Sequence, residues 1–361
     1  MIYSFRNFKN VAYFAFGRGT FDRLGEILAP RRKGRGSYVV FLVDQVFEDR
    51  PLRERIPVQE KDKLIWVSVE EEPTTGRVDH YRDEILAYAD SLPDAVIGIG
   101  GGSVMDYAKA VALMLTNPGS SSAYQGLDLI RNPGIFKVCV PTLSGTGAEV
   151  SMTTVLSGPE KKLGIKCDYT MPDQVVLDPA LTEGAPRDQR FYTGMDCYIH
   201  AVECLTGTWR NAYSDAFAEK SLALCREVFL DDGLPSPEAD EKLMIASYLG
   251  GMSVTYSQVG VCHALSYGLS FVLHTRHGLA NSIAFNRLED VYPEGVRDFH
   301  AMVEKQGIEL PENLTAGLSD EQLDRMVDTA FRLEHMWDHA FGKDWRGKVS
   351  PQWIRDLFSR M

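Results

Sequence analysis

The two halves of the chain carry different patterns of apolar and polar positions. The first half holds short apolar runs that are separated by polar turns and amphipathic stretches. These runs lie at 37–43, 64–69, 95–99, 137–140 and 175–177. They predict strands buried on both faces of a parallel sheet, with helices between them. After Pro186 the patterns are helical and broken by glycines. We therefore expect an α/β domain over 1–185 and an all-α domain over 186–361.

Composition disfavours contact with nucleic acid and with membranes. With 38 Lys and Arg against 50 Asp and Glu, the net charge of −12 opposes binding to phosphate backbones or anionic lipids. We expect no membrane span, because no apolar run approaches the roughly 18 residues that a spanning helix needs. The first residues also lack the apolar core of a signal peptide. Six cysteines without a Cys-x-x-Cys pair indicate free thiols and a cytoplasmic location.

A glycine-rich turn follows the predicted strand at 95–99. Gly100, Gly101 and Gly102 lead into a helical pattern that starts near Ser103. Glycines let the backbone approach a pyrophosphate closely, and a helix N-terminus offers N–H groups and a positive dipole end. The run is not a Gly-x-Gly-x-x-Gly fingerprint, so tight packing of strand against helix is the alternative interpretation. The turn is a candidate phosphate site.

Other polar side chains that suit a dinucleotide also follow predicted strands. A second glycine-rich turn presents the hydroxyls of Thr142, Ser144 and Thr146 for a diphosphate and a ribose, and Lys162 adds a positive charge. Asp44 ends the strand at 37–43, where a carboxylate can hold the hydroxyls of an adenine ribose. A loop or capping role for Asp44 is equally consistent with the sequence. The first half is therefore interpreted as a Rossmann-like dinucleotide domain.

One carboxylate and three histidines of the second half have the spacing of a metal site. Asp196 and His200 are four residues apart, which places them on one face of a helix. His263 and His277 are fourteen apart, which suits a helix, a turn and a second helix start. A surface pair or a cap is the commoner role of such an Asp–His pair, but the apolar neighbours predict burial, and buried polar groups need partners. Oxygen and nitrogen donors suit Fe2+, Zn2+, Mn2+ or Ni2+.

Four motifs resemble those of the iron-containing, or type III, alcohol dehydrogenases. They are Gly-Gly-Gly-Ser-x-x-Asp-x-x-Lys at 100–109, Pro-Thr-x-x-Gly-Thr-Gly-x-Glu at 141–149, Gly-Met-Asp-x-x-x-His-Ala-x-Glu at 194–203 and the two-histidine segment at 263–278. The resemblance covers nearly the whole chain. It implies a dinucleotide domain followed by a helical metal-binding domain, an architecture similar to that of dehydroquinate synthase, with the metal in the cleft between the domains. It also implies a homodimer.

The resemblance assigns roles to individual residues. It implies that a divalent metal, Fe2+ or Zn2+, is bound by Asp196, His200, His263 and His277. The dinucleotide, NAD or NADP, falls to Asp44, Gly101, Gly102, Ser103, Asp106, Thr142, Ser144, Thr146 and Lys162. Tyr267 stands four residues after His263, where the family commonly has a second histidine that relays a proton. Tyr267 is therefore one catalytic candidate, and His274, three residues before His277, is the other, with a surface role as its alternative.

The resemblance implies an alcohol oxidoreductase, in which the metal polarises a hydroxyl and a hydride passes to the nicotinamide. Within the family the chain looks like the group that oxidises the C8 hydroxyl of 3-deoxy-manno-octulosonate, an acidic sugar of lipopolysaccharide, so that an aminotransferase can follow. One alternative is a NAD-dependent dehydrogenase of a small alcohol or diol, such as lactaldehyde or propanediol, glycerol or butanol. Others are an oxidase that uses oxygen as the acceptor, a lyase similar to dehydroquinate synthase, and a nucleotide or metal binder without catalysis. The Asp-x-x-x-His pair argues against the lyase, whose group has Glu in that place.

Overall fold

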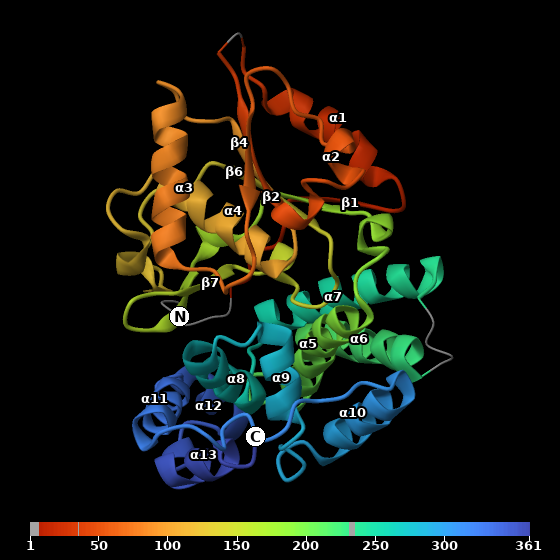
Figure 1. The fold of residues 1–361 in the computed structure, drawn as a ribbon, viewed down its shortest axis with the longest axis vertical. Helices are drawn as coiled ribbons and strands as arrows, with labels where there is room; N and C mark the ends of the chain where they lie inside the picture. The colour runs from red at the N-terminus through yellow and green to blue at the C-terminus, as the bar shows by residue number, and fades with distance from the viewer. Residues whose placement is uncertain (1–6, 35, 231–234) are drawn as a thin grey trace. The chain divides into compact units, whose positions relative to one another are not determined.

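The chain forms two compact units in the computed structural model, which describes residues 7–34, 36–230 and 235–361 (Figure 1). Unit 1 comprises Met1–Leu143 and Ala148–Thr182, and unit 2 comprises Ser144–Gly147 and Glu183–Met361. The predicted fold class, an α/β part followed by a helical part, is confirmed. The main division lies close to the expected one after residue 185. The short segment Ser144–Gly147, expected in the first domain, clusters with unit 2.

Unit 1 is built on a six-stranded sheet whose pairings are all parallel. In spatial order its strands are β1 (Tyr13–Phe16), β9 (Gln174–Leu177), β6 (Phe136–Pro141), β4 (Ala95–Gly100), β2 (Val39–Asp44) and β3 (Lys63–Val67). In register, Val43 lies beside Ile99 and Gly100 beside Pro141. The carboxyl ends of β2, β4 and β6 therefore meet at one edge of the sheet.

Helices cover both faces of this sheet. One face carries α3 (Thr75–Tyr88) and α4 (Gly102–Met114). The other carries α1 (Leu24–Leu28) and α2 (Leu52–Arg55). Alternate residues of β2 enter the two layers, Val40 and Leu42 on one side and Phe41 and Val43 on the other. This double burial explains the uninterrupted apolar run in the sequence. A smaller sheet, not expected from the sequence, pairs β5 (Gly126–Leu127), β8 (Lys162–Lys166) and β7 (Thr153–Ser157).

Unit 2 is helical and is organised around α5. Its helices are α5 (Arg187–Thr206), α6 (Ala212–Leu230), α7 (Pro237–Tyr256), α8 (Val261–Leu273), α9 (His277–Phe285), α10 (Pro293–Gln306), α11 (Asp320–Phe331), α12 (Glu334–Phe341) and α13 (Pro351–Phe358). The α5 helix contacts α6, α7 and α9 and is buried along most of its length, so its polar side chains need partners inside the unit. None of the helices that the structure describes combines the length and the apolar character needed to cross a bilayer.

Two glycines explain why Ser144–Gly147 clusters with the helices. A Cβ atom on Gly145 would lie 1.7 Å from the carbonyl oxygen of Thr193 on α5, and a Cβ atom on Gly147 would lie 2.5 Å from Gly251 on α7. Gly145 N also donates a hydrogen bond of 2.7 Å to Ser247 Oγ. At positions 145 and 147 the backbone is therefore packed so closely on two helices of unit 2 that only glycine fits.

Candidate metal centre

The α5 helix brings three polar side chains to one buried face. Asp196, His200 and Glu203 are separated by four and three residues, so they lie along the same side of the helix. All three are buried. Two other helices supply histidines, because His263 belongs to the first turn of α8 and His277 begins α9. The ends of α8 and α9 are thereby directed at the middle of α5.

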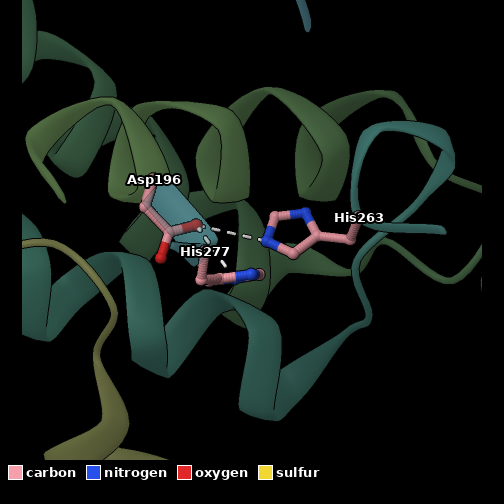
Figure 2. Close-up of side chains that lie close together, drawn as sticks. All are labelled: Asp196, His263 and His277. Carbon is pink, nitrogen blue, oxygen red and sulfur yellow. Dashed lines mark hydrogen bonds and ion pairs between the residues drawn. The ribbon is translucent and has the colours of Figure 1, made fainter. Parts of the chain in front are cut away.

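One oxygen of Asp196 is the point on which the histidines converge. Asp196 Oδ1 lies 3.2 Å from His263 Nε2, 3.5 Å from His200 Nε2 and 3.7 Å from His277 Nε2. Figure 2 shows the imidazoles of His263 and His277 directed at this carboxylate. The rings of His200 and His263 are stacked, with centroids 4.7 Å apart. The structure therefore brings together all four residues that the family resemblance assigns to a metal.

The donor set fits a divalent cation. Atoms bound to one such ion at about 2.0–2.2 Å lie roughly 3.0–3.5 Å apart, close to the spacing around Asp196 Oδ1. Donor atoms of Asp196, His263 and His277 all lie within 4.8 Å of one another. Asp196 Oδ2 and His200 Nδ1 are buried and make no hydrogen bond to the residues described. The cluster thus contains polar atoms that protein groups leave unsatisfied, which is unusual unless another partner binds there.

The electrostatics of the cluster also favour a cation. Burial raises the pKa of Asp196, but the nearby charges of His200 and His277 and the hydrogen bond with His263 outweigh burial and hold this pKa well below its usual range. Burial lowers the pKa of His200 to about 4. Burial also lowers the pKa of His263, but the charge of Glu203 and the hydrogen bond to Asp196 reverse the shift and raise this pKa to about 9. Positive charge is therefore stabilised beside Asp196.

Two residues to which the sequence assigned no role complete the cluster, although Glu203 is the last residue of the motif at 194–203. Glu203 Oε2 lies 2.6 Å from His263 Nδ1. Asn281 Nδ2 donates to Asp196 Oδ1 at 2.6 Å and lies 3.3 Å from His263 Nε2 and 3.2 Å from His277 Nε2. Helical spacing was the available signal, since Glu203 follows Asp196 by seven residues on α5 and Asn281 follows His277 by four on α9.

The two catalytic candidates lie in different surroundings. Tyr267 is one helical turn beyond His263 on α8, is buried, and has its ring centroid 5.9 Å from that of His277. His274 ends α8 in a left-handed conformation, at φ 55°, and is exposed. Among the residues that the structure describes, no hydrogen bond, ion pair or ring contact joins His274 to the histidine cluster. Tyr267 is therefore the candidate that borders the site, and a catalytic role for either residue stays a prediction.

The candidate phosphate turn follows β4 in unit 1. Gly101 caps α4, which begins at Gly102 and Ser103, so these residues lie where the unpaired N–H groups of a helix start are found. A Cβ atom on Gly100 would lie 2.6 Å from Val104 Cγ2, so tight packing of strand on helix also explains the first glycine of the run. Asp44 ends β2 at the same sheet edge and accepts a hydrogen bond from Val46 N at 3.0 Å. These three elements remain the predicted dinucleotide site.

Other predicted cofactor residues already have protein partners. Asp106 pairs with Lys109 Nζ at 2.9 Å and accepts a hydrogen bond from Val155 N at 3.0 Å. Lys162 Nζ lies 3.2 Å from Glu72 Oε2.

The three residues with predicted cofactor-binding hydroxyls belong to different units. Thr142 is in unit 1, and Ser144 and Thr146 are in unit 2. Ser144 Oγ is buried and makes no hydrogen bond to the residues described.

Two sequence profiles of one protein family match the chain. The profile described as "Iron-containing alcohol dehydrogenase" matches residues 12–179, and the one described as "Fe-containing alcohol dehydrogenase family, C-terminal" matches residues 190–303. The chain belongs to the iron-containing alcohol dehydrogenase family. The resemblance inferred from the four motifs is confirmed at this level.

Relatives within the iron-containing alcohol dehydrogenases align with part of the chain. Sulfoacetaldehyde reductase of Bilophila wadsworthia is 32% identical over 239 residues, which are 64% of this chain and 60% of that protein. Probable alcohol dehydrogenase EutG of Escherichia coli is 34% identical over 212 residues, 54% of this chain and 52% of that protein. The matched region thus spans about half to three fifths of the length of these relatives.

Solved structures from this alcohol dehydrogenase family share the fold over the whole chain. Sulfoacetaldehyde reductase from Bifidobacterium kashiwanohense, solved in complex with NAD+, has a TM-score of 0.81 and covers 98% of this chain and 97% of its own. Its sequence is 20% identical, so the comparison establishes the fold alone.

Proposed function

We propose that the protein is a metal-dependent oxidoreductase that interconverts a primary alcohol and an aldehyde, with a nicotinamide dinucleotide as hydride carrier. The convergence of three imidazole nitrogens on Asp196 Oδ1 is the observation that carries the proposal. Membership of the alcohol dehydrogenase family supports an oxidoreductase over the lyase considered above.

Asp196, His200, His263 and His277 are the proposed ligands of Fe2+ or Zn2+. Such a cation, when bound, would supply Lewis acidity towards the oxygen of the substrate, and a nicotinamide would supply the hydride chemistry. The chain contributes one negative charge through Asp196 and an array of imidazoles held by three helices. Burial of the cluster strengthens each of these electrostatic contacts.

For the dinucleotide we propose a site at Asp44, Gly101, Gly102 and Ser103, with NAD preferred over NADP. The start of α4 suits a diphosphate, and the Asp44 carboxylate suits ribose hydroxyls but repels a 2′-phosphate. The sulfoacetaldehyde reductase from Bifidobacterium kashiwanohense that shares the fold was solved with NAD+. Contacts to Asp106, Thr142, Ser144, Thr146 and Lys162 remain part of the proposal.

For the substrate we propose an anionic primary alcohol, and within that class the C8 hydroxyl of 3-deoxy-manno-octulosonate. The sugar acid rests on the sequence resemblance alone, and its aldehyde would then be available to an aminotransferase. Two relatives are named sulfoacetaldehyde reductases, which supports an anionic substrate in more general terms. A small neutral alcohol or diol is the second candidate, and the relative named as an alcohol dehydrogenase favours it.

Metal content and turnover test the proposal together. Purified protein is loaded with Fe2+ or Zn2+ and offered the alcohols 3-deoxy-manno-octulosonate, propanediol, glycerol and butanol with NAD, NADP or oxygen as the acceptor, and sulfoacetaldehyde with NADH or NADPH as the hydride donor. We expect one equivalent of metal and the highest kcat/KM for an anionic compound with NAD. The same turnover after complete metal removal would refute the proposal, and peroxide release without added dinucleotide would favour the oxidase alternative.

A homodimer in the cytoplasm is the proposed setting. Strand β1 lies at one edge of the sheet and exposes Tyr13 and Phe14, with 63% and 57% of their surface accessible. An edge strand with exposed aromatic side chains is a suitable surface for pairing with a second copy. All six cysteines are free and buried, as expected in a reducing compartment. Light scattering of wild type and Phe14→Lys tests the dimer, and an unchanged mass for the variant would exclude this edge.

A further inference from the structure

Glu203 lies where α5 meets the first turn of α8. Its Oε2 atom is 2.6 Å from His263 Nδ1, and its Oε1 atom accepts a hydrogen bond of 2.7 Å from Cys262 N. Tyr292 Oη lies 3.3 Å from the same Oε1 atom. The side chain is 1% exposed. Both carboxylate oxygens are thus engaged, and one of them contacts a candidate metal ligand.

The contact determines which nitrogen of His263 carries hydrogen. An ionised carboxylate only accepts hydrogen bonds, so a neutral His263 beside Glu203 has its hydrogen on Nδ1. Nε2, which lies 3.2 Å from Asp196 Oδ1, is then the nitrogen whose lone pair binds a cation when the cation replaces the hydrogen shared with Asp196. The imidazole is held at one end by Glu203 and presents its free electron pair to the centre of the cluster at the other.

We propose that Glu203 is a positioning residue that holds His263 in the tautomer and ring orientation needed to bind a divalent cation. This inference rests on the proposed metal site. Carboxylates that accept a hydrogen bond from a ligating histidine orient the ring and strengthen it as a ligand. Glu203 also adds a second negative charge beside Asp196, so that two carboxylates and neutral imidazoles balance the charge of one divalent ion.

The hydrogen-bond donors at the start of α8 require a carboxylate at position 203. His263 Nδ1, Cys262 N and Tyr292 Oη, which face its oxygens, are all donors. A glutamine presents one oxygen and one NH2 group, so Glu203→Gln leaves one donor facing another donor. If the NH2 group faces the imidazole, the hydrogen of His263 has to move to Nε2, the atom that binds the metal. The variant preserves volume and removes the feature that selects the tautomer.

The test measures Zn2+ affinity by competition with a chromophoric chelator, using the full chain. Glu203→Gln is expected to weaken Zn2+ binding by about 10–100-fold. Tyr292→Phe is the matched control, because it deletes a buried hydroxyl that contacts the same carboxylate and accepts a hydrogen bond of 3.2 Å from Val261 N at the start of α8, and it leaves the contact with His263 intact. We expect this control to bind Zn2+ as tightly as the wild type.

The outcomes separate the inference from the proposed function. If the wild type fails to bind Zn2+, the proposed metal-dependent function and the positioning role of Glu203 are both refuted. If wild type and Glu203→Gln bind Zn2+ equally, only the positioning role is refuted. Equal losses in Glu203→Gln and Tyr292→Phe would also overturn it, since the network would then act through packing alone. NMR of the Zn2+-loaded wild type with 15N-labelled histidine provides a second measurement that needs no folded Glu203 variant. A hydrogen-bonded Nδ1–H resonance that disappears in His263→Ala is expected, and its absence would contradict the proposal.

Discussion

The side-chain amide of Asn281 donates a hydrogen bond of 2.6 Å to Asp196 Oδ1, the oxygen that also faces three imidazoles. The amide nitrogen lies 3.3 Å from His263 Nε2 and 3.2 Å from His277 Nε2. One amide hydrogen is thus directed at the Asp196 carboxylate, and the same NH2 group lies within hydrogen-bonding distance of two ring nitrogens that are candidate metal ligands. In metal-free protein Asn281 therefore provides part of the stabilisation that the cation provides when bound.

We expect Asn281→Ala to destabilise the metal-free protein more than the metal-loaded protein. Loss of a buried hydrogen bond to a charged acceptor should lower the free energy of unfolding by about 1.5–3 kcal/mol. A bound cation compensates Asp196 directly, so the loss should be smaller when Zn2+ is saturating. Urea unfolding of wild type and variant, with chelator and with Zn2+, measures both values. Equal losses in the two states would contradict this role.

His277→Ala should abolish activity and leave the chain folded. The side chain of His277 is 25% exposed at the start of α9, so its removal opens no large cavity. Loss of a ligand should lower kcat/KM by about a thousandfold or more, because Lewis-acid catalysis contributes several kcal/mol. His300→Ala, at an exposed histidine of α10, is the control and should keep full activity. Metal analysis and circular dichroism establish whether metal loss or unfolding is responsible.

Asp44→Ala should shift the cofactor preference towards NADP. The carboxylate is 8% exposed at the end of β2, and its removal deletes both the acceptor for ribose hydroxyls and the charge that repels a 2′-phosphate. The ratio of kcat/KM for NADP to that for NAD should rise about 10-fold or more, given 1.5–3 kcal/mol for a hydrogen bond to a charged group. Asp49→Ala, at an exposed position shortly after β2, should leave the ratio unchanged. An unchanged ratio in Asp44→Ala would place the adenine ribose elsewhere.

Asp62 should make unit 1 sensitive to acid. Its carboxylate accepts hydrogen bonds from the Arg32 guanidinium at 2.8 and 2.7 Å and from the N–H groups of Val39 and Gln59. Burial raises the pKa of Asp62, but these hydrogen bonds outweigh burial and leave the pKa below its ordinary value. Because the pKa is lower in the folded state, the stabilisation is present above the unfolded pKa, about 3.9, and is lost as the pH falls through the folded pKa.

The free energy of unfolding should therefore decrease more steeply below about pH 4 in wild type than in Asp62→Asn. Asp90→Asn, which removes an exposed carboxyl from the same unit, should keep the wild-type steepness. Chemical denaturation across this pH range measures the slopes. Parallel curves for wild type and Asp62→Asn would rule out the linkage.

Gly278→Ala should weaken metal binding by displacing α9. A Cβ atom there would lie 2.7 Å from the carbonyl oxygen of Tyr192 on α5, so the residue next to His277 cannot carry a side chain without a shift of the helix. Gly76 is also the second residue of a helix, but a Cβ atom there meets nothing within 4 Å. Gly76→Ala should raise stability by about 0.4–1 kcal/mol. Thermal unfolding and Zn2+ titration measure the stability and the metal affinity of both variants. Equal Zn2+ affinity in Gly278→Ala and Gly76→Ala would contradict the prediction, because α9 would then shift without disturbing the metal site.

Local periodicity explains what the sequence predicts well. The buried strands appear as apolar runs, and Asp196 and His200 share a face because four residues make about one helical turn. The convergence of His263 and His277 on that face came from the family motifs, since two helix ends separated by a turn can be directed to many places. Residue spacing alone predicts the helices but not where their histidines converge.

Partners distant in sequence were beyond prediction. Glu203 and His263 are 60 residues apart, and Asn281 and Asp196 are 85 apart, so no local pattern links them. Asp106 and Lys162 were assigned to the dinucleotide, and the fold pairs them with Lys109 and Glu72. Such pairings depend on tertiary packing, which a pattern of apolar and polar positions does not encode.

The course of the chain between the units limits how the protein can be dissected. The polypeptide leaves unit 1 after Leu143, returns at Ala148 and leaves again after Thr182. A fragment that starts at Glu183 would lack Gly145 and with it the hydrogen bond to Ser247 and the backbone that covers Thr193. A chimera that exchanges unit 2 for that of a homologue therefore has to replace two separate segments, Ser144–Gly147 and Glu183–Met361, together.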